Sequence, residues 1–295
     1  EMPMEKEYFI AVYLKHVTGL IRYIKQAEEQ RLIAGLIYID NYDEVMSSVE
    51  EVRQSLLVAL VDRKINQYIA KVDGIVKKME NDKYFIVFKK QYFKQFYVDD
   101  ILIIPSWEEV KPEDNDKMVI HIDPGTAFGT GMHETTQLCI RQIRKYTTPE
   151  TTILDVGCGS GILGMLALKF GAKYSVGTDL DPCAIEATYE NMEVNGISKE
   201  MYEVMIGNVI DDKDVQDKVG YGKYDIVVAN ILADVLVALT PVIVDQLKDG
   251  GIYITSGIID DKEETVVEAV KAAGLEVLEV TYQGEWVSVT ARKNG

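Results

Sequence analysis

One stretch, residues 152–181, constrains the fold of this chain more than any other. It opens with an apolar run around Asp155. The run ends in three alternating glycines, Gly157, Gly159 and Gly161. Apolar residues then recur at helical spacing over 162–170, and a second short apolar segment leads to Asp179. Glycines let the backbone approach a ligand closely, and an acid at the tip of the next strand can accept hydrogen bonds from a ribose. The stretch predicts a strand–turn–helix–strand unit that binds a nucleotide-like ligand.

The glycines match two kinds of nucleotide site. Residues 159–164 form a literal G-x-G-x-x-G, the fingerprint of dinucleotide sites, which points to NAD. In the other register, residues 155–161 read D-x-G-x-G-x-G, which resembles the first motif of S-adenosylmethionine methyltransferases. Cys158 lies inside this turn, where a small residue is tolerated, and we interpret it as such rather than as a nucleophile.

Composition limits the possible environments and partners. The three cysteines form no C-x-x-C and no paired framework, which predicts reduced thiols in a cytoplasm. The longest apolar runs are too short to span a bilayer, so no membrane association is expected. Acids outnumber bases 48 to 31, giving a formal net charge of −17. Because phosphate binding depends on clustered Lys and Arg, we expect no direct nucleic-acid substrate and favour a basic protein partner.

Two domains joined by a linker are expected. Alternating apolar segments in residues 1–80 predict a small α+β domain with strand–helix–strand–helix order: Phe9–Leu14, Val17–Glu29, Gly35–Asp40 and Tyr42–Leu60. Residues 81–117 mix aromatic residues with lysine and end in a charged segment around Pro112, which predicts a connecting linker. The second domain is expected to cover residues 118–295.

A glycine-rich loop precedes the central unit. Residues 120–136 predict a strand, a loop with three glycines and a helix that begins near His133. Such a loop can close over a ligand, and Phe128 in its middle offers a flat apolar surface. Thr135 and Thr136 can cap the helix or donate to a ligand carboxylate. On its own, His133 is best interpreted as an ordinary polar residue at a helix start.

Strands and helices alternate after the central unit. The expected strands are Tyr202–Ile206, Tyr224–Asn230 and Ile252–Ser256, and the expected helices are Pro182–Asn195, Ile231–Leu247 and Asp261–Ala273. Residues 275–282 and 286–292 predict an antiparallel hairpin. This order predicts an α/β doubly wound sheet with one reversed strand near its edge, typical of the class I methyltransferase fold. Ligands of such sheets bind beyond the carboxyl ends of the strands, where Gly157, Asp179 and Asn230 are expected, which favours S-adenosylmethionine over NAD.

Several motifs together resemble one family. They are D-P-G-T-A-F-G-T-G-M-H-E-T-T (123–136), D-V-G-C-G-S-G-I-L (155–163), D-L-D-P (179–182), A-N-I-L-A (229–233), S-G-I (256–258) and E-W-V (285–287). In this order they are similar to the PrmA family, the bacterial methyltransferases that modify protein eleven of the large ribosomal subunit. The resemblance covers roughly residues 104–293. It implies a ferredoxin-like substrate-recognition domain in residues 1–80, and methylation of lysine side-chain and N-terminal amines with S-adenosylmethionine and without a metal.

The same resemblance implies roles for individual residues. Contacts to the methyl donor fall on Phe128, His133, Thr136, Gly157, Gly159, Asp179 and Asn230. Gly157 and its neighbours would line the amino-acid end of the donor, and Asp179 would hold its ribose. Asn230 would position the incoming amine, which must first lose a proton at a cost of about 4–5 kcal/mol at neutral pH. Because a carboxylate holds that proton on, we expect acids at the docking rim and neutral groups around the reacting nitrogen.

Other functions remain open at this stage. No proline follows Asn230, unlike the Asn-Pro-Pro-Tyr usual in methyltransferases of planar amide or base nitrogens. Within the same chemistry, the alternative acceptors are another protein or a small amine. Outside it, the chain would be an NAD-dependent dehydrogenase or a non-catalytic ribosome-binding module that keeps the donor pocket.

Overall fold

The structure is a computed structural model of the 295-residue chain. It describes residues 32–39, 42, 46–47, 51–71, 74–89, 94–123 and 131–295. The chain divides into two compact units, Glu1–Lys94 and Gln95–Gly295, and each is treated by itself. The expected strand Phe9–Leu14 and helix Val17–Glu29 lie outside the described residues.

The first unit contains a three-stranded antiparallel sheet and a long helix. Its elements are β1 (Leu32–Tyr38), α3 (Glu51–Lys71), β2 (Ile75–Lys78) and β3 (Lys83–Lys89), and the sheet order is β1-β3-β2. Tyr84 of β3 is buried, and its hydroxyl donates a hydrogen bond to Asp62 of α3. Lys78 of β2 reaches the same carboxylate at 2.9 Å, so α3 packs on the sheet face that carries Tyr84.

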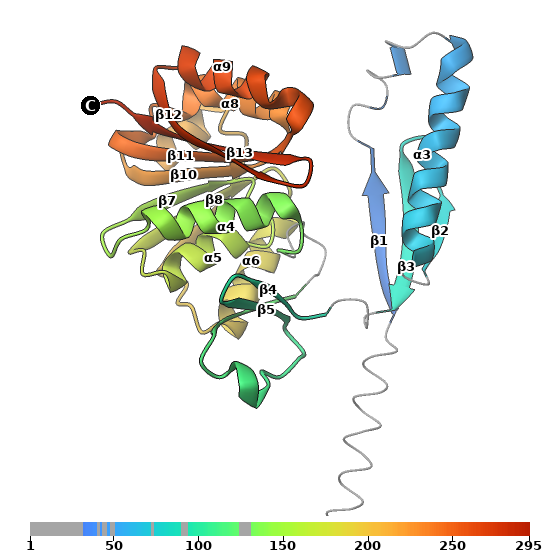
Figure 1. Cartoon of the computed structure of the whole chain (residues 1–295), viewed down its shortest axis with the longest axis horizontal. Coiled ribbons are helices and arrows are strands. Elements are labelled where there is room, and N and C mark those ends of the chain that lie inside the picture. Colours follow the sequence, from blue (N-terminus) through green and yellow to red (C-terminus); the bar gives the residue numbers. More distant parts are fainter. Residues whose placement is uncertain are drawn as a thin grey trace, which may run out of the picture. The chain divides into compact units, whose positions relative to one another are not determined.

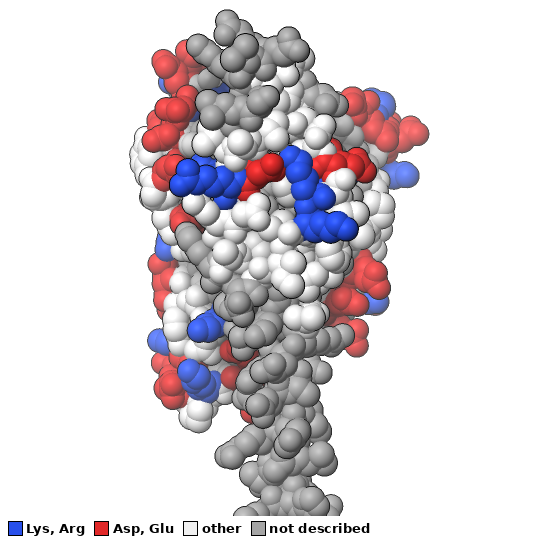
Figure 2. All heavy atoms as spheres, turned by 90° about the vertical axis from the view of Figure 1, so that its right-hand side faces the viewer, with Lys and Arg blue, Asp and Glu red and all other residues white. Residues whose placement is uncertain are grey.

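Charges of both signs share the surface of the described residues. In the first unit Lys78 pairs with Asp62 and Lys83 with Glu80, at 2.9 and 2.7 Å. Figure 2 shows the same mixture on one face of the chain, where Lys and Arg side chains lie beside Asp and Glu side chains. The described residues drawn on that face form no unbroken basic surface of the kind that binds a phosphate backbone.

The segment expected to be a linker, residues 81–117, is built into both units instead. Its first part forms β3, which pairs with both other strands of the first sheet. The rest belongs to the second unit as β4 (Phe96–Val98), β5 (Ile101–Pro105) and η2 (Pro112–Asp114). All five residues of β5 are buried, so this apolar run is a core strand. Pro112 begins the short helix η2 and does not mark a boundary between domains.

The second unit holds the doubly wound sheet. Its strands are β7 (Thr152–Val156), β8 (Tyr174–Asp179), β9 (Tyr202–Ile206), β10 (Tyr224–Asn230), β11 (Leu247–Ile259), β12 (Leu275–Gln283) and β13 (Trp286–Lys293). The sheet order is β12-β13-β11-β10-β7-β8-β9. The neighbouring strands β11, β10, β7, β8 and β9 pair in parallel in that order. Strand β13 is antiparallel to both β11 and β12. The predicted doubly wound fold with a reversed strand near one edge is confirmed.

Helices cover both faces of this sheet (Figure 1). One face packs against α4 (Glu134–Tyr146), α5 (Ile162–Lys169) and α6 (Cys183–Val194). The other packs against α7 (Lys213–Val219), α8 (Ala233–Ile243) and α9 (Glu263–Ala272), with η3 (Asp260–Lys262) leading into α9. A small sheet of β4, β5 and β6 (Met118–Ile122) extends the first core. The helix expected over 231–247 is shorter than predicted, because a turn after Ile243 leads into β11 at Leu247.

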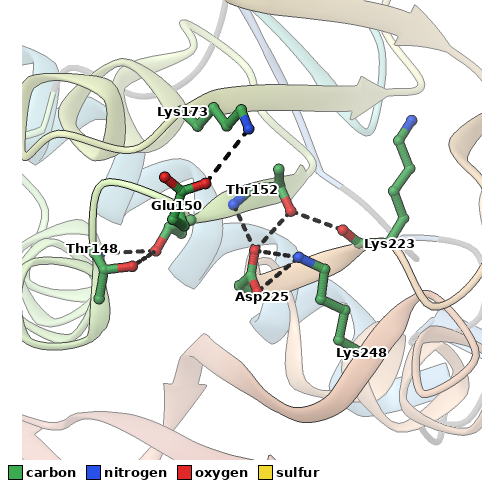
Figure 3. Close-up of polar contacts among 8 residues, drawn as sticks. Thr148, Glu150, Thr152, Lys173, Lys223, Asp225 and Lys248 are labelled. Atoms are coloured by element: carbon green, nitrogen blue, oxygen red, sulfur yellow. Dashed lines mark hydrogen bonds and ion pairs between the residues drawn. The ribbon is translucent and has the colours of Figure 1, made fainter.

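The amino edge of the sheet is held by its own polar contacts. Asp225, near the start of β10, accepts hydrogen bonds from the backbone N–H and the hydroxyl of Thr152, at 2.8 and 2.9 Å. Lys248 of β11 donates to both oxygens of the same carboxylate at 2.8 Å. Figure 3 shows these contacts joining the starts of three neighbouring strands, β7, β10 and β11. Burial by itself would raise the pKa of Asp225. The hydrogen bonds from Lys248 and Thr152 outweigh this effect and lower the pKa.

Candidate functional site

The opposite, carboxyl edge of the sheet brings the expected site residues together. Asp179 ends β8 and Asn230 ends β10, and the glycine turn follows β7, which lies between these two strands. The backbone N–H groups of Gly157 and Cys158 donate to the carbonyl of Thr178 at 2.7 and 3.0 Å. The turn is therefore fixed to the end of β8.

Asp179 faces the glycine turn. Its Oδ2 accepts a hydrogen bond from the Gly159 N–H at 2.8 Å, and its Oδ1 accepts one from the Asp181 N–H at 2.9 Å. A carboxylate has roughly four acceptor positions, so two further hydrogen bonds can be accepted there. Asp179 is half-buried, which leaves it accessible from the edge of the sheet.

Gly157 leaves space between the turn and the end of β10. Its φ is +75°, a conformation that favours glycine. A Cβ at this position would lie 2.7 Å from Cγ2 of Ile231, the residue after Asn230. Gly157 is also exposed, so the backbone here is bare and accessible. A ligand can therefore approach the main chain closely at this point.

Asp155, at the end of β7, holds the start of α5 next to the glycine turn. It is buried, and its Oδ2 accepts hydrogen bonds from the Gly164 N–H at 3.1 Å and the Tyr202 hydroxyl at 3.3 Å. The N-cap residue of α5 is Gly161, which has no side chain, so Asp155 takes over the capping of this helix. Its Oδ1 finds no hydrogen-bond partner within the part of the chain that the structure describes. Burial raises the pKa of Asp155 to about 7.

The start of α4 lies against the end of β10. His133 is the N-cap of α4, and its Nδ1 accepts a hydrogen bond from the Thr135 N–H at 3.3 Å. The Asn230 amide donates from Nδ2 to Oγ1 of Thr136 at 3.1 Å. The structure thus places Thr136 beside Asn230, and it agrees with the interpretation of His133 as a helix-start residue. Phe128 falls in residues 124–130, outside the described part of the chain.

Two residues near the site were not predicted. Trp286 meets His133 edge-on, with ring centroids 4.7 Å apart and an interplanar angle of 68°. Asn191 of α6 is buried; its Oδ1 accepts from the Asp123 N–H at 2.8 Å, and its Nδ2 donates to the Ser160 carbonyl at 3.1 Å. Trp286 lies in the E-W-V motif, which was a usable signal. Asn191 follows no motif, because its contacts depend on the tertiary fold.

The thiol of Cys158 is buried, and burial raises its pKa, so it is a neutral packing group in the turn. No group of three or more His, Cys, Asp or Glu among the described residues is arranged to hold a metal ion. Nor does any described helix combine the length and apolar character needed to cross a bilayer.

Comparison with known proteins assigns the family. Residues 16–294 match the family model described as ribosomal protein L11 methyltransferase (PrmA). The chain belongs to this family. A ribosomal protein L11 methyltransferase of Agathobacter rectalis is 59% identical over 207 residues, covering 69% of this chain and 64% of that protein. One of Lachnospira eligens is 48% identical over 258 residues, covering 87% of this chain and 79% of the relative.

A solved structure supports the same assignment. The ribosomal protein L11 methylase of Lactobacillus delbrueckii subsp. bulgaricus is 31% identical, with a TM-score of 0.62. The match covers 69% of this chain and all of that one. The resemblance drawn from the motifs is therefore confirmed, and so is the methyltransferase fold. Membership of this family leaves the dehydrogenase alternative without support.

Proposed function

We propose that this chain transfers methyl groups from S-adenosylmethionine to lysine side-chain and N-terminal amines of ribosomal protein L11. The names of its relatives support the acceptor. The observation that carries the proposal is the hydrogen bond between Asn230 and Thr136, which lies next to the glycine turn. It joins the two segments that the family resemblance assigns to the donor and to the acceptor amine.

The carboxyl edge fits the methyl donor. Gly157 keeps the turn free of a side chain where the amino-acid end of the donor is expected. Asp179 can accept hydrogen bonds from both ribose hydroxyls in addition to the two backbone donors it already has. Gly159, His133, Thr136 and Phe128 complete the proposed set. When bound, S-adenosylmethionine supplies an electrophilic methyl group on a sulfonium.

Asn230 suits an amine acceptor because it is neutral. Its Nδ2 donates to Thr136, so its Oδ1 is the atom that it offers to an N–H of the amine. Accepting that hydrogen bond aims the nitrogen lone pair toward the donor, and such positioning lowers the barrier of a bimolecular transfer. A carboxylate at this place would stabilise the ammonium form and raise the cost of losing its proton.

The reaction is tested by mass spectrometry of L11 after incubation with the protein and S-adenosylmethionine. Methyl-sized mass increments are expected with the wild type. Asp179→Ala is expected to lose them through weaker donor binding, and Asn230→Ala through slower turnover with donor binding retained. Asp249→Ala, an exposed aspartate at the amino edge, is the matched control.

If L11 is not methylated, calorimetric titrations with S-adenosylmethionine and with NAD show whether the proposed acceptor or the proposed donor is wrong. A protein that binds the donor but leaves L11 unmodified would refute the acceptor. Absence of donor binding would refute the whole proposal. Turnover of any kind would exclude a non-catalytic ribosome-binding module.

The binding partner, the substrate-recognition domain and the cellular location belong to the same proposal. The net charge of −17 supports a basic protein partner without a direct nucleic-acid substrate. Residues 1–80, which lie in the first unit, take the role of substrate recognition in this proposal. The expected cytoplasmic location follows from a sequence without a C-x-x-C pair or a disulfide-like cysteine framework. Each of these stays a prediction.

A further inference from the structure

A chain of contacts connects Asn230 to the tip of the C-terminal hairpin. Asn230 donates to Thr136 in the first turn of α4. His133, the N-cap of the same helix, packs against Trp286 at the start of β13. Trp286 in turn lies opposite Ile259 in the pairing of β13 with the end of β11. These contacts place the hairpin tip and the end of β11 beside the candidate acceptor site.

The chain of contacts returns to Asn230 through η3 and α8. The Asp260 N–H at the start of η3 donates to the carbonyl of Glu285 in the hairpin tip at 3.0 Å. Lys262 of η3 donates to Asp234 in the first turn of α8, also at 3.0 Å. Since α8 begins three residues after Asn230, these contacts form a closed ring of segments that includes Asn230.

The segments of this ring carry exposed apolar side chains as well as charged ones. Five exposed side chains on its segments form what we call the acceptor rim: Met132, Leu232, Val235, Ile259 and Tyr282. Their exposed fractions are 49%, 53%, 38%, 37% and 58%, in that order. Leu232 and Val235 are three residues apart at the start of α8 and so share one side of that helix. Apolar side chains gathered around a site indicate a surface that contacts a partner.

The charges around the acceptor rim select the kind of partner. The ring segments 132–134, 232–235, 259–263 and 282–286 carry six acids against one base, Lys262. That base is paired with Asp234, whose side chain is nevertheless 72% exposed. An acidic surround attracts a basic chain and disfavours an acidic one. Asn230, the member of the ring that would contact the amine, is itself neutral, so the acids can attract the acceptor without bonding the reacting nitrogen.

We propose that the acceptor rim binds the segment of the acceptor protein that carries the target amine. The acceptor rim selects segments in which apolar side chains and additional basic residues lie near the target amine. This inference rests on the proposed function and adds the recognition surface to it. The apolar residues supply contact area, and the acids supply attraction and orientation.

The test is calorimetric binding of L11 to the full-length protein, measured without methyl transfer. Leu232→Ser with Val235→Ser is expected to weaken binding on the order of tenfold, because two exposed apolar contacts are lost. Asp260→Lys with Asp261→Lys is expected to weaken binding similarly at low salt and to reduce its dependence on salt. The affinity for S-adenosylmethionine is expected to stay unchanged in both.

Matched controls have the same chemistry away from the rim. Val194→Ser with Met201→Ser removes two exposed apolar side chains near the ends of α6 and β9. Asp245→Lys with Asp249→Lys reverses two exposed acids before and within the first residues of β11. The inference is overturned if the rim variants bind L11 no more weakly than these controls. Failure of the proposed function would look different, since the wild type would then bind L11 and leave it unmethylated.

Discussion

At Gly161 the absence of a side chain decides whether the glycine turn can close. This residue has φ +77° and is the N-cap of α5. A Cβ here would lie 2.6 Å from Cγ2 and 2.9 Å from Oγ1 of Thr188. The Thr188 hydroxyl meanwhile donates to the carbonyl of Gly159 at 3.1 Å. Thr188 thus fills the space that glycine leaves and binds the turn at the same time.

Gly161→Ala is therefore expected to destabilise the protein more than a comparable change at Gly196. Gly196 also has positive φ (+65°), but no described atom lies within 4 Å of a Cβ built there. Both substitutions incur about 1–2 kcal/mol for a left-handed alanine. Only Gly161→Ala adds the overlap with Thr188. The comparison is made by denaturant unfolding, and equal losses of unfolding free energy would contradict the argument.

Asp155 gives the protein a titrating group inside its core. Burial raises the pKa of this carboxyl to about 7, so the folded protein keeps the proton over a range in which the unfolded chain has lost it. The contribution of Asp155 to stability is fully present below about pH 4, the usual aspartate pKa. It is lost as the pH rises toward 7.

Asp155→Asn is expected to remove this fall in stability. Asparagine keeps an oxygen that accepts the Gly164 N–H but does not titrate. Between about pH 4 and 7, the wild type should lose on the order of 1.4 kcal/mol per pH unit relative to the variant, and nothing more above 7. The measurement is the free energy of unfolding of both proteins at about pH 5 and about pH 8. Parallel pH profiles would show that Asp155 is ionised throughout this range.

At the scale of elements, α6 connects the glycine turn to β6. Asn191 joins the end of β6 to the turn through Asp123 and Ser160. One helical turn later, Asn195 accepts from the His121 N–H at 2.9 Å and donates to the His121 carbonyl at 2.6 Å. The two amides replace the hydrogen bonds that a neighbouring strand would give to β6.

Asn191→Ala is expected to lower the free energy of unfolding by about 1–3 kcal/mol, because two hydrogen bonds of a buried amide are lost. Donor affinity should fall with it, since Ser160 lies in the glycine turn. Asn294→Ala removes an exposed amide that bonds one carbonyl at 3.3 Å and serves as the control. Denaturant unfolding and donor titration are compared for both. A donor affinity that is unchanged in Asn191→Ala would show that α6 does not support the donor site.

The sequence predicted the elements of the second unit better than those of the first. Parallel strands buried on both faces, such as β10, appear as continuous apolar runs, so their limits were predictable. The helix expected over 42–60 overlaps α3, which runs on to Lys71, and exposed charged residues such as Arg63 and Lys64 interrupt the apolar pattern there. Strand β2 has only four residues, too few for a pattern.

In the candidate site, too, only the residues of local motifs could be predicted from the sequence. Gly157 and Asp179 belong to one local motif, so the sequence could place them together. The contacts of Asn191 with Ser160 and of His133 with Trp286 join segments that are distant in the chain. No local pattern encodes such contacts.

At the scale of the whole molecule, charge should govern how fast a basic partner associates. With a net charge of −17, the chain attracts such a partner over about 10 Å at 0.1 M salt. The association rate constant with L11 is expected to fall steeply from about 0.05 to 0.5 M sodium chloride, while the dissociation rate constant changes little. Stopped-flow measurements over this range test it. An association rate independent of salt would show that the charge serves solubility only.

The position of β13 also sets when the site can form during synthesis. The ribosome makes this strand after β11 and β12, yet it lies between them in the sheet. A nascent chain that ends before Trp286 leaves both older strands without this neighbour, and it also lacks the ring that packs on His133. The proposed acceptor site is therefore complete only after β13 has been synthesised and has paired with β11 and β12.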